Sequence, residues 1–144
     1  MQNLKQEEKG LNFLFKDSYL KTIENSIGSK IFKNLYFEKD GKKVDVLENG
    51  NLSCAVFVSW ILRNFYLIKD AHTTVSGTVK DLESSGWHKI EKPKIGAVLV
   101  WEEKKFENGP HKHIGFYIDE NEAISNKAEK GFPEKHHWTF GPKS

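Results

Sequence analysis

The single cysteine of the chain, Cys54, stands where the polar turn NLS meets the apolar segment CAVFVSWIL. A thiol attacks a carbonyl carbon only as the thiolate, and at an ordinary pKa of about 8.5 only a few per cent is ionised at neutral pH. The first turn of a helix favours a negative charge by about 0.3 to 1 kcal/mol, which is less than one pKa unit. Cys54 therefore needs a histidine beside it to act as a nucleophile.

The histidine that we single out is His113, because it opens the alternating segment HIGFYIDE, which predicts a β-strand. Alternation places His113 and Gly115 on one face of that strand and the large apolar residues on the other. A glycine on the histidine face leaves space above the sheet for a ligand or another backbone. The chain has six histidines in all: His72, His88, His111, His113, His136 and His137.

The next predicted strand, EAISN, supplies the group that orients the imidazole. An even-numbered turn through DENE places Asn126 opposite Gly115 and within side-chain reach of His113. The amide oxygen then accepts the Nδ1–H of the imidazole and leaves Nε2 toward the thiol. One residue of slip or bulge exchanges Asn126 for Ser125. The predicted set is Cys54, His113 and Asn126, with Ser125 or a C-terminal histidine as the alternative third residue.

Helices are expected in the first half of the chain. Apolar residues recur at helical spacing between Leu11 and Ile27, and the segment from Cys54 to Phe65 is apolar around almost its whole circumference. The first pattern predicts an N-terminal helix and the second a buried central helix, which Ser53 or Asn51 can cap. A short amphipathic helix is predicted within VSGTVKDLESSGW, and Asp40-Gly41 predicts a hairpin.

Strands follow Pro93, in IGAVLVWEE, HIGFYIDE, EAISN and HHWTF. Parallel strands need helical crossovers, for which this part of the chain has little room, so the sheet should be antiparallel. The predicted fold is α+β, with N-terminal helices packed on a C-terminal antiparallel sheet. The length of 144 residues fits one domain, residues 1–144.

Composition narrows the classes of partner and the location. The net charge is +2, and basic residues form no stripe with interleaved aromatics, so no nucleic-acid partner is predicted. We find neither a signal peptide nor an apolar run that would span a bilayer, which predicts a cytoplasmic protein unless a leader has been removed. One cysteine excludes an intramolecular disulfide, and we expect a monomer.

Three segments, in this order, resemble the NlpC-type papain-like peptidases of the bacterial cell wall, to which the CHAP amidases are related. SCAVFVSWIL is similar to the cysteine-bearing helix start of that family, and KPKIGAVLVW to its strand that a proline and a glycine introduce. HIGFYIDENEAISN is similar to the histidine strand, the hairpin and the strand with the third residue. The chain departs from many members at Ser53, where they have aspartate, and after Cys54, where they have serine-glycine.

The resemblance implies a papain-like cysteine hydrolase in which Cys54 is the nucleophile, His113 the general base and acid, and Asn126 or Ser125 the orienting group. It implies cleavage of an amide bond in peptidoglycan stem peptides, or between peptide and glycan, through a thioester. The oxyanion would be held by the backbone N–H of Cys54 and a second donor. Neither a metal nor a cofactor is implied. The charged segment 102–112 either shapes a substrate groove or is a solvated loop.

Two other functions fit parts of the sequence. The first is a metal site that combines His111, His113 and the pair His136-His137 with Cys54 as a soft ligand. No pair has the spacing of a zinc motif, however, and adjacent histidines on a strand point to opposite faces. The second is an inactive module of the same fold that binds a peptide or a glycan on a platform of aromatic side chains. The residues proposed for that platform are Trp87, Trp101, Tyr117 and Trp138.

Overall fold

The chain folds as predicted into a mixed α+β structure, which a computed structural model describes for residues 10–106 and 109–140, with the backbone alone at 103–106 and 109–111. Over that range there are three helices and two antiparallel sheets. In chain order the elements are α1 (Phe15–Asn25), β1 (Tyr36–Lys39), β2 (Lys42–Asp45), α2 (Cys54–Asn64), α3 (Val75–Ser84), β3 (Val98–Phe106), β4 (Gly109–Asp119), β5 (Glu122–Lys127) and β6 (Phe132–His137).

The larger sheet has the order β3-β4-β5-β6, so every strand pairs with its neighbour along the chain. This meander confirms the predicted antiparallel sheet, since the short turns between its strands permit no parallel pairing. The expected strand HHWTF is wrong in its bounds, because β6 begins at Phe132 and ends at His137. Pro133 is tolerated inside β6 because this strand lies at the edge of the sheet, where a missing N–H breaks no ladder.

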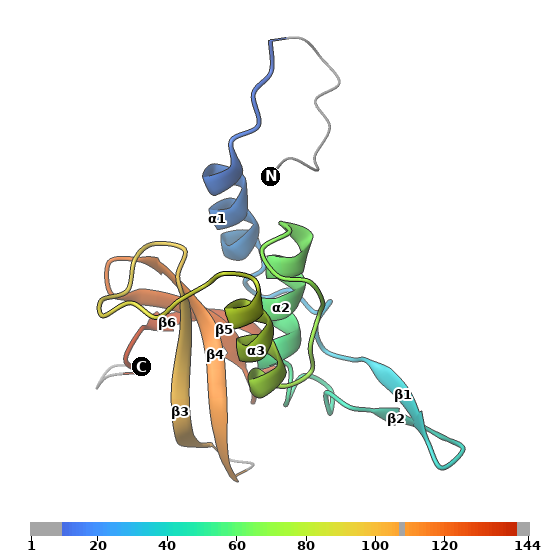
Figure 1. Cartoon of the computed structure of the whole chain (residues 1–144). Helices are drawn as coiled ribbons and strands as arrows, with labels where there is room; N and C mark the ends of the chain where they lie inside the picture. Colours follow the sequence, from blue (N-terminus) through green and yellow to red (C-terminus); the bar gives the residue numbers. More distant parts are fainter. Residues whose placement is uncertain (1–9, 107–108, 141–144) are drawn as a thin grey trace.

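Helix α2 packs against β4 and β5 and forms the centre of the hydrophobic core (Figure 1). Phe57 is fully buried and meets Phe116 of β4 edge to face, with ring centroids 5.4 Å apart. On α2, only Trp60, Arg63 and Asn64 are exposed. Helix α2 is apolar around nearly its whole circumference because it packs against β4, β5 and α3 on different sides.

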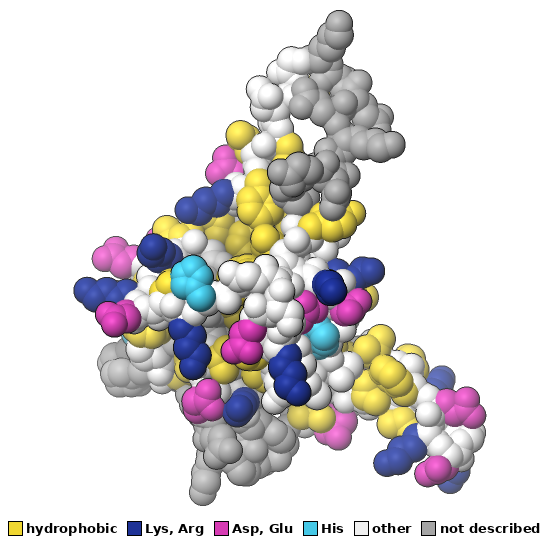
Figure 2. All heavy atoms as spheres, in the orientation of Figure 1, with side chains coloured by type: hydrophobic (Ala, Val, Ile, Leu, Met, Phe, Trp, Pro, Cys, Tyr) yellow, Lys and Arg dark blue, Asp and Glu magenta, His cyan; other side chains and the backbone are white. Residues whose placement is uncertain are grey.

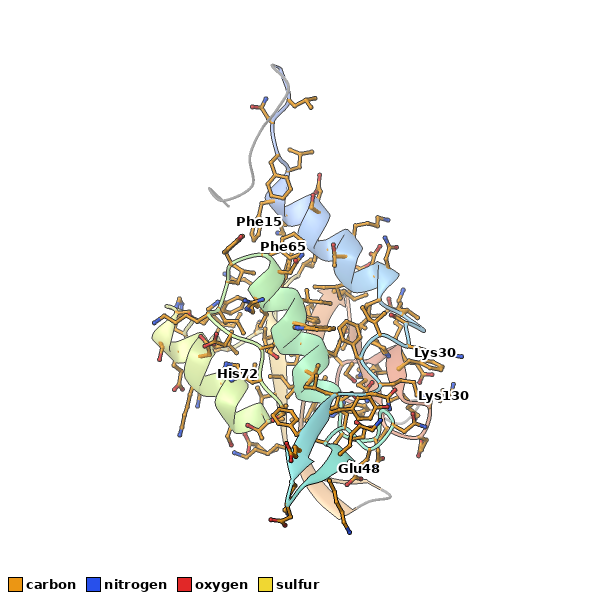
Figure 3. The ribbon with its side chains drawn as sticks, turned by 90° about the vertical axis from the view of Figure 1, so that its right-hand side faces the viewer. Phe15, Lys30, Glu48, Phe65, His72 and Lys130 are labelled. Atoms are coloured by element: carbon orange, nitrogen blue, oxygen red, sulfur yellow. The ribbon has the colours of Figure 1, made fainter. Side chains whose placement is uncertain are left out.

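Helix α1 covers the end of the core where α2 finishes. Phe15 of α1 and Phe65, next to the end of α2, lie together with ring centroids 5.9 Å apart (Figure 3). The Tyr19 hydroxyl donates a hydrogen bond to the carbonyl of Gly96, 2.8 Å away, and burial raises the pKa of Tyr19 well above its usual range. These contacts fix α1 to the segment that leads into β3.

The hairpin of β1 and β2 points away from both the helices and the larger sheet (Figure 1). Its turn is the predicted Asp40-Gly41, and both residues have positive φ, 53° and 77°, as a two-residue hairpin turn requires. Tyr36 and Phe37 are 57% and 52% exposed, and Figure 2 shows hydrophobic side chains on this arm.

The loop between α2 and α3 is held by the buried carboxylate of Asp81. It accepts hydrogen bonds from the backbone N–H groups of Lys69 and Asp70, and its Oδ2 lies 2.7 Å from Nε2 of His72, which Figure 3 labels beside α3. Partial burial acts to raise the pKa of Asp81, but the hydrogen bonds, led by that of His72, outweigh it and hold the pKa well below its usual range.

Candidate active site

Cys54 is the first residue of α2, as the sequence predicts. Ser53 is the residue before the helix, but its side chain makes no capping hydrogen bond, so the expectation that it caps α2 with its hydroxyl is wrong. Ser53 is fully buried, and its Oγ has no hydrogen-bond partner among the residues that the structure describes. The first turn of α2 thus keeps N–H groups that no side-chain cap satisfies.

The thiol of Cys54 meets the backbone of β4. Its sulfur accepts a hydrogen bond from the N–H of Ile114, and the N–H groups of Ala55 and Cys54 itself point to it as well. The amide nitrogen of Ile114 is bonded to the carbonyl carbon of His113. The fold therefore brings the thiol to the strand residue that follows the predicted catalytic histidine.

Burial raises the pKa of Cys54 to about 11, and the three backbone N–H groups lower it by less than burial raises it. The side chain is half-buried and packs against the hydrophobic core. At neutral pH the resting form is therefore the neutral thiol, because an apolar surrounding disfavours the charged form. Attack by this sulfur on a carbonyl carbon would require a base that takes the thiol proton.

His113 lies on the face of β4 that it shares with Gly115, as predicted, and its side chain is buried. The expected free space above Gly115 is absent. A Cβ at this position would come within 2.7 Å of the Ser125 Cβ and 3.1 Å of the Trp101 ring. Glycine is needed at position 115 because the side chains of Ser125 and Trp101 occupy the space that a Cβ would take. Both side chains also contact the imidazole of His113.

Ser125 lies beside His113, and the prediction that Asn126 does so is wrong. Gly115 pairs with Ser125 because the ladder between β4 and β5 shifts between Tyr117 and Asp119. The irregularity moves every later side chain of β5 to the opposite face. The Oγ of Ser125 lies 2.9 Å from Nε2 of His113, so Nε2 meets the orienting group and the expected assignment of the two ring nitrogens is reversed.

Asn126 points to the other face of the sheet and contacts the turn that leads to Cys54. Its Nδ2 donates a 2.8 Å hydrogen bond to the carbonyl of Gly50, while its buried Oδ1 has no partner within the described ranges. Gly50 has φ of 94°, and a Cβ there would come within 2.4 Å of the Cα of Gly131. Asn126 and this glycine contact hold the turn before Cys54 against the turn between β5 and β6.

A further residue near Ser125 is His136 of β6, which the sequence predicts as a candidate metal ligand and, only as an unspecified C-terminal histidine, as a candidate third residue. Its Nε2 lies 2.7 Å from the Ser125 Oγ, and its Nδ1 lies 2.7 Å from the carbonyl oxygen of His137. The pairing of Ala123 with His136 puts His136 on the face of Ser125, and His137 on the opposite one. The available signal was the pair of adjacent histidines, because one of two neighbours on a strand must face the site.

Aromatic rings cover this face of the sheet. Trp101 pairs across the ladder with His113 and lies 5.3 Å from it between ring centroids, and Phe140 stacks on His136 at 4.2 Å. Three residues of the proposed aromatic platform, Trp101, Tyr117 and Trp138, lie close together. The Trp101 Nε1 donates a hydrogen bond to the Trp138 carbonyl, and the ring centroids of Tyr117 and Trp138 are 6.1 Å apart. Trp87 lies elsewhere and donates to the Leu67 carbonyl.

The predicted metal set is only partly within the described side chains, because His111 lies outside them, as does most of the segment 102–112. Among the side chains that the structure does describe, no three histidines, cysteines or carboxylates are grouped so as to hold a metal ion. No helix in the described ranges is long and apolar enough to cross a bilayer.

A separate groove of about 460 Å³ lies at the opposite end of α2 from Cys54. It is formed by the end of α1, the segment after it and the second half of α2, and none of the predicted site residues lines it. The predicted site residues lie instead at the first turn of α2 and on strands β4 and β5.

The groups that could do thiol chemistry are thus a cysteine at a helix start, the strand histidine that precedes its hydrogen-bond partner Ile114, and a hydroxyl that holds the imidazole. Comparison with known proteins gives no match to a family model, to a curated protein or to a solved structure.

Proposed function

We propose that the protein is a papain-like cysteine hydrolase that cleaves an amide bond, with Cys54 as nucleophile and His113 as general base and acid. The observation that carries the proposal is the hydrogen bond from the Ile114 N–H to the Cys54 sulfur, directly after a histidine that Ser125 holds. The order of the elements, a cysteine-bearing helix packed on an antiparallel sheet, supports the resemblance to the NlpC-type peptidases.

The raised thiol pKa favours a mechanism in which proton transfer accompanies attack. As the sulfur bonds to the carbonyl carbon of the substrate, His113 takes the thiol proton, and the carbonyl oxygen becomes an oxyanion. The backbone N–H groups of the first turn of α2 are the donors for that oxyanion. The carbon–nitrogen bond then breaks, His113 gives its proton to the leaving amine, and water hydrolyses the thioester.

The energetic cost of this route can be set against the structure. A thiol with a pKa of about 11 lies more than four units above an ordinary imidazole, so complete proton transfer in the resting site costs about 6 kcal/mol. Stabilisation of the oxyanion by one well-placed donor contributes about 3 to 4 kcal/mol, which offsets most of that cost. The mechanism thus depends on donors that act only once the substrate carbonyl is bound.

The substrate that we propose is an amide in peptidoglycan stem peptides, as the family resemblance implies. Incubation of the protein with purified stem-peptide fragments, followed by mass spectrometry, tests the proposal directly. Hydrolysis is expected in the parent and is expected to disappear in both Cys54→Ala and His113→Ala. The matched control is His88→Gln, which changes an exposed histidine after α3 and should leave the rate unchanged.

The second candidate function is a module that binds such fragments without cleaving them, and the raised pKa of Cys54 is the observation that favours it. The two candidates differ in one measurement. Fragment binding by both the parent and Cys54→Ala, with no product from the parent after prolonged incubation, would establish the binding module and refute the hydrolase.

A further inference from the structure

A continuous chain of hydrogen bonds crosses three strands on the face of the sheet that carries His113. It runs from Nε2 of His113 on β4 to the Oγ of Ser125 on β5, and from there to Nε2 of His136 on β6. It ends where Nδ1 of His136 meets the carbonyl oxygen of His137. We refer to His113, Ser125 and His136 as the relay.

The direction of every hydrogen bond in the relay follows from its last member. A carbonyl oxygen can only accept, so Nδ1 of His136 carries the proton in that contact. Nε2 of a neutral His136 then has a lone pair and accepts the hydroxyl proton of Ser125. The oxygen of Ser125 is left to accept, which requires the proton of a neutral His113 to be on Nε2.

We propose that His136 is a positioning residue that acts through Ser125 to fix the tautomer of His113, so that Nδ1 of His113 is the basic nitrogen. The proposal deepens the proposed function, since it names the nitrogen that takes the Cys54 proton. The tautomer itself is a property of the resting protein and does not depend on whether an amide is cleaved.

Serine at position 125 leaves the tautomer of His113 to be set by a second group. An asparagine amide has its acceptor oxygen and its donor NH2 on separate atoms, so the orientation of the amide decides which of them meets an imidazole. A serine hydroxyl donates or accepts equally well, and its orientation is set by its other neighbour. His136 is that neighbour, and it forces the hydroxyl proton away from His113.

The carbonyl at the end of the relay is held by backbone structure. The His137 oxygen also accepts the N–H of Phe140 at 3.0 Å, which closes the turn after β6. Trp101 of β3 ties the same turn to the sheet through a 2.8 Å hydrogen bond from its Nε1 to the Trp138 carbonyl. The stacked ring of Phe140 fixes the plane of the His136 imidazole. The direction of the relay is therefore built into the fold.

Nitrogen NMR of the imidazoles tests the proposal without a substrate. Protein labelled with ¹⁵N in its histidines is examined at about pH 8, where ordinary histidines are neutral. The parent is expected to show His136 with its proton on Nδ1 and His113 with its proton on Nε2. A parent spectrum with neutral His113 protonated on Nδ1 would overturn the proposal whatever the variants do.

Three variants separate the relay from a general structural effect. Ser125→Ala should leave His136 protonated on Nδ1 but return His113 to a mixture of tautomers. His136→Phe, which keeps a ring against Phe140 but removes the acceptor, should have the same effect on His113. His136→Gln, whose amide oxygen can accept from Ser125, should keep His113 on Nε2, and the control His88→Gln should change nothing.

A folded His136→Phe protein in which His113 keeps a single Nε2–H tautomer would refute the role of His136. The stem-peptide assay on the same samples keeps the two proposals distinguishable. Expected tautomers without hydrolysis would refute the hydrolase and support the relay, whereas hydrolysis with His113 on Nδ1 would do the reverse.

Discussion

The ionisation of Cys54 is the property on which the proposed chemistry depends, and alkylation of the thiol measures it directly. Burial raises its pKa to about 11, which is two to three units above an ordinary thiol. The fraction of thiolate at neutral pH is then about 100- to 300-fold smaller than that of an exposed cysteine. The rate of reaction with iodoacetamide should be smaller by a similar factor and should rise about tenfold per pH unit up to at least pH 9.

The chain offers a matched control for this experiment. Ser76 lies in the first turn of α3 and is exposed. The double variant Cys54→Ala/Ser76→Cys therefore places the only thiol on the surface, near the start of a helix about as long as α2. Its pKa should be close to or slightly below the ordinary value, because the helix dipole acts there without burial. Parent protein unfolded in urea gives a second reference with an ordinary pKa.

A thiol pKa below 8.5 in the folded parent would refute this reasoning. It would mean that a preformed thiolate–imidazolium pair outweighs burial and that His113 is already charged in the resting site. Measurement of the pH–rate profile in His113→Ala would then test His113 as the partner of Cys54, since loss of the imidazolium must return the thiol pKa upward. Alkylation followed by intact-mass spectrometry gives all of these rates, because the chain has one cysteine.

Three further predictions concern stability. Because the pKa of Cys54 is raised in the folded state, its thiol favours folding below the pKa of the unfolded chain and loses that contribution as pH rises toward 11. The free energy of unfolding of the parent, measured by urea denaturation, should therefore fall by about 2 to 3 kcal/mol between pH 9 and 11. The fall should be smaller in Cys54→Ala. Gly115→Ala should cost about 1 to 3 kcal/mol, because the new methyl group meets Ser125 at 2.7 Å; an unchanged melting temperature would contradict the packing described. Asp81→Ala should lower the free energy of unfolding by about 3 kcal/mol at pH 7, since it leaves two backbone N–H groups unpaired. The difference from the parent should shrink below about pH 4, because the lowered pKa of the Asp81 carboxylate no longer favours folding there.

Residue patterns alone predict the parts of the site that depend on periodicity. The apolar circumference of the segment from Cys54 onward identifies the buried helix and places the cysteine at its start. Alternation in HIGFYIDE identifies the strand and the face of His113. Both signals are local, because each depends only on which residues must face the core.

The identity of the third residue is not a local property. Asn126 and Ser125 differ by one position, and the choice between them depends on an irregularity between Tyr117 and Asp119 that no residue type in the turn announces. The bounds of β6 depend likewise on edge position, which makes Pro133 acceptable and brings His136 to the site. The raised pKa of the thiol has a similar origin, since sequence reasoning weighs the helix dipole and the imidazole but not the burial that neighbouring elements produce.

The contact between the turn before Cys54 and the turn between β5 and β6 has a consequence for when the site can form. Gly50 touches Gly131, and Asn126 binds the Gly50 carbonyl, so the turn before Cys54 is held by residues synthesised long after it. Contacts at such sequence separation form late in folding, because the intervening loop must close first. On a ribosome the cysteine helix would emerge well before the strands that position it. The turn before Cys54 would therefore take up its final position only after β5 and the turn that follows it have folded.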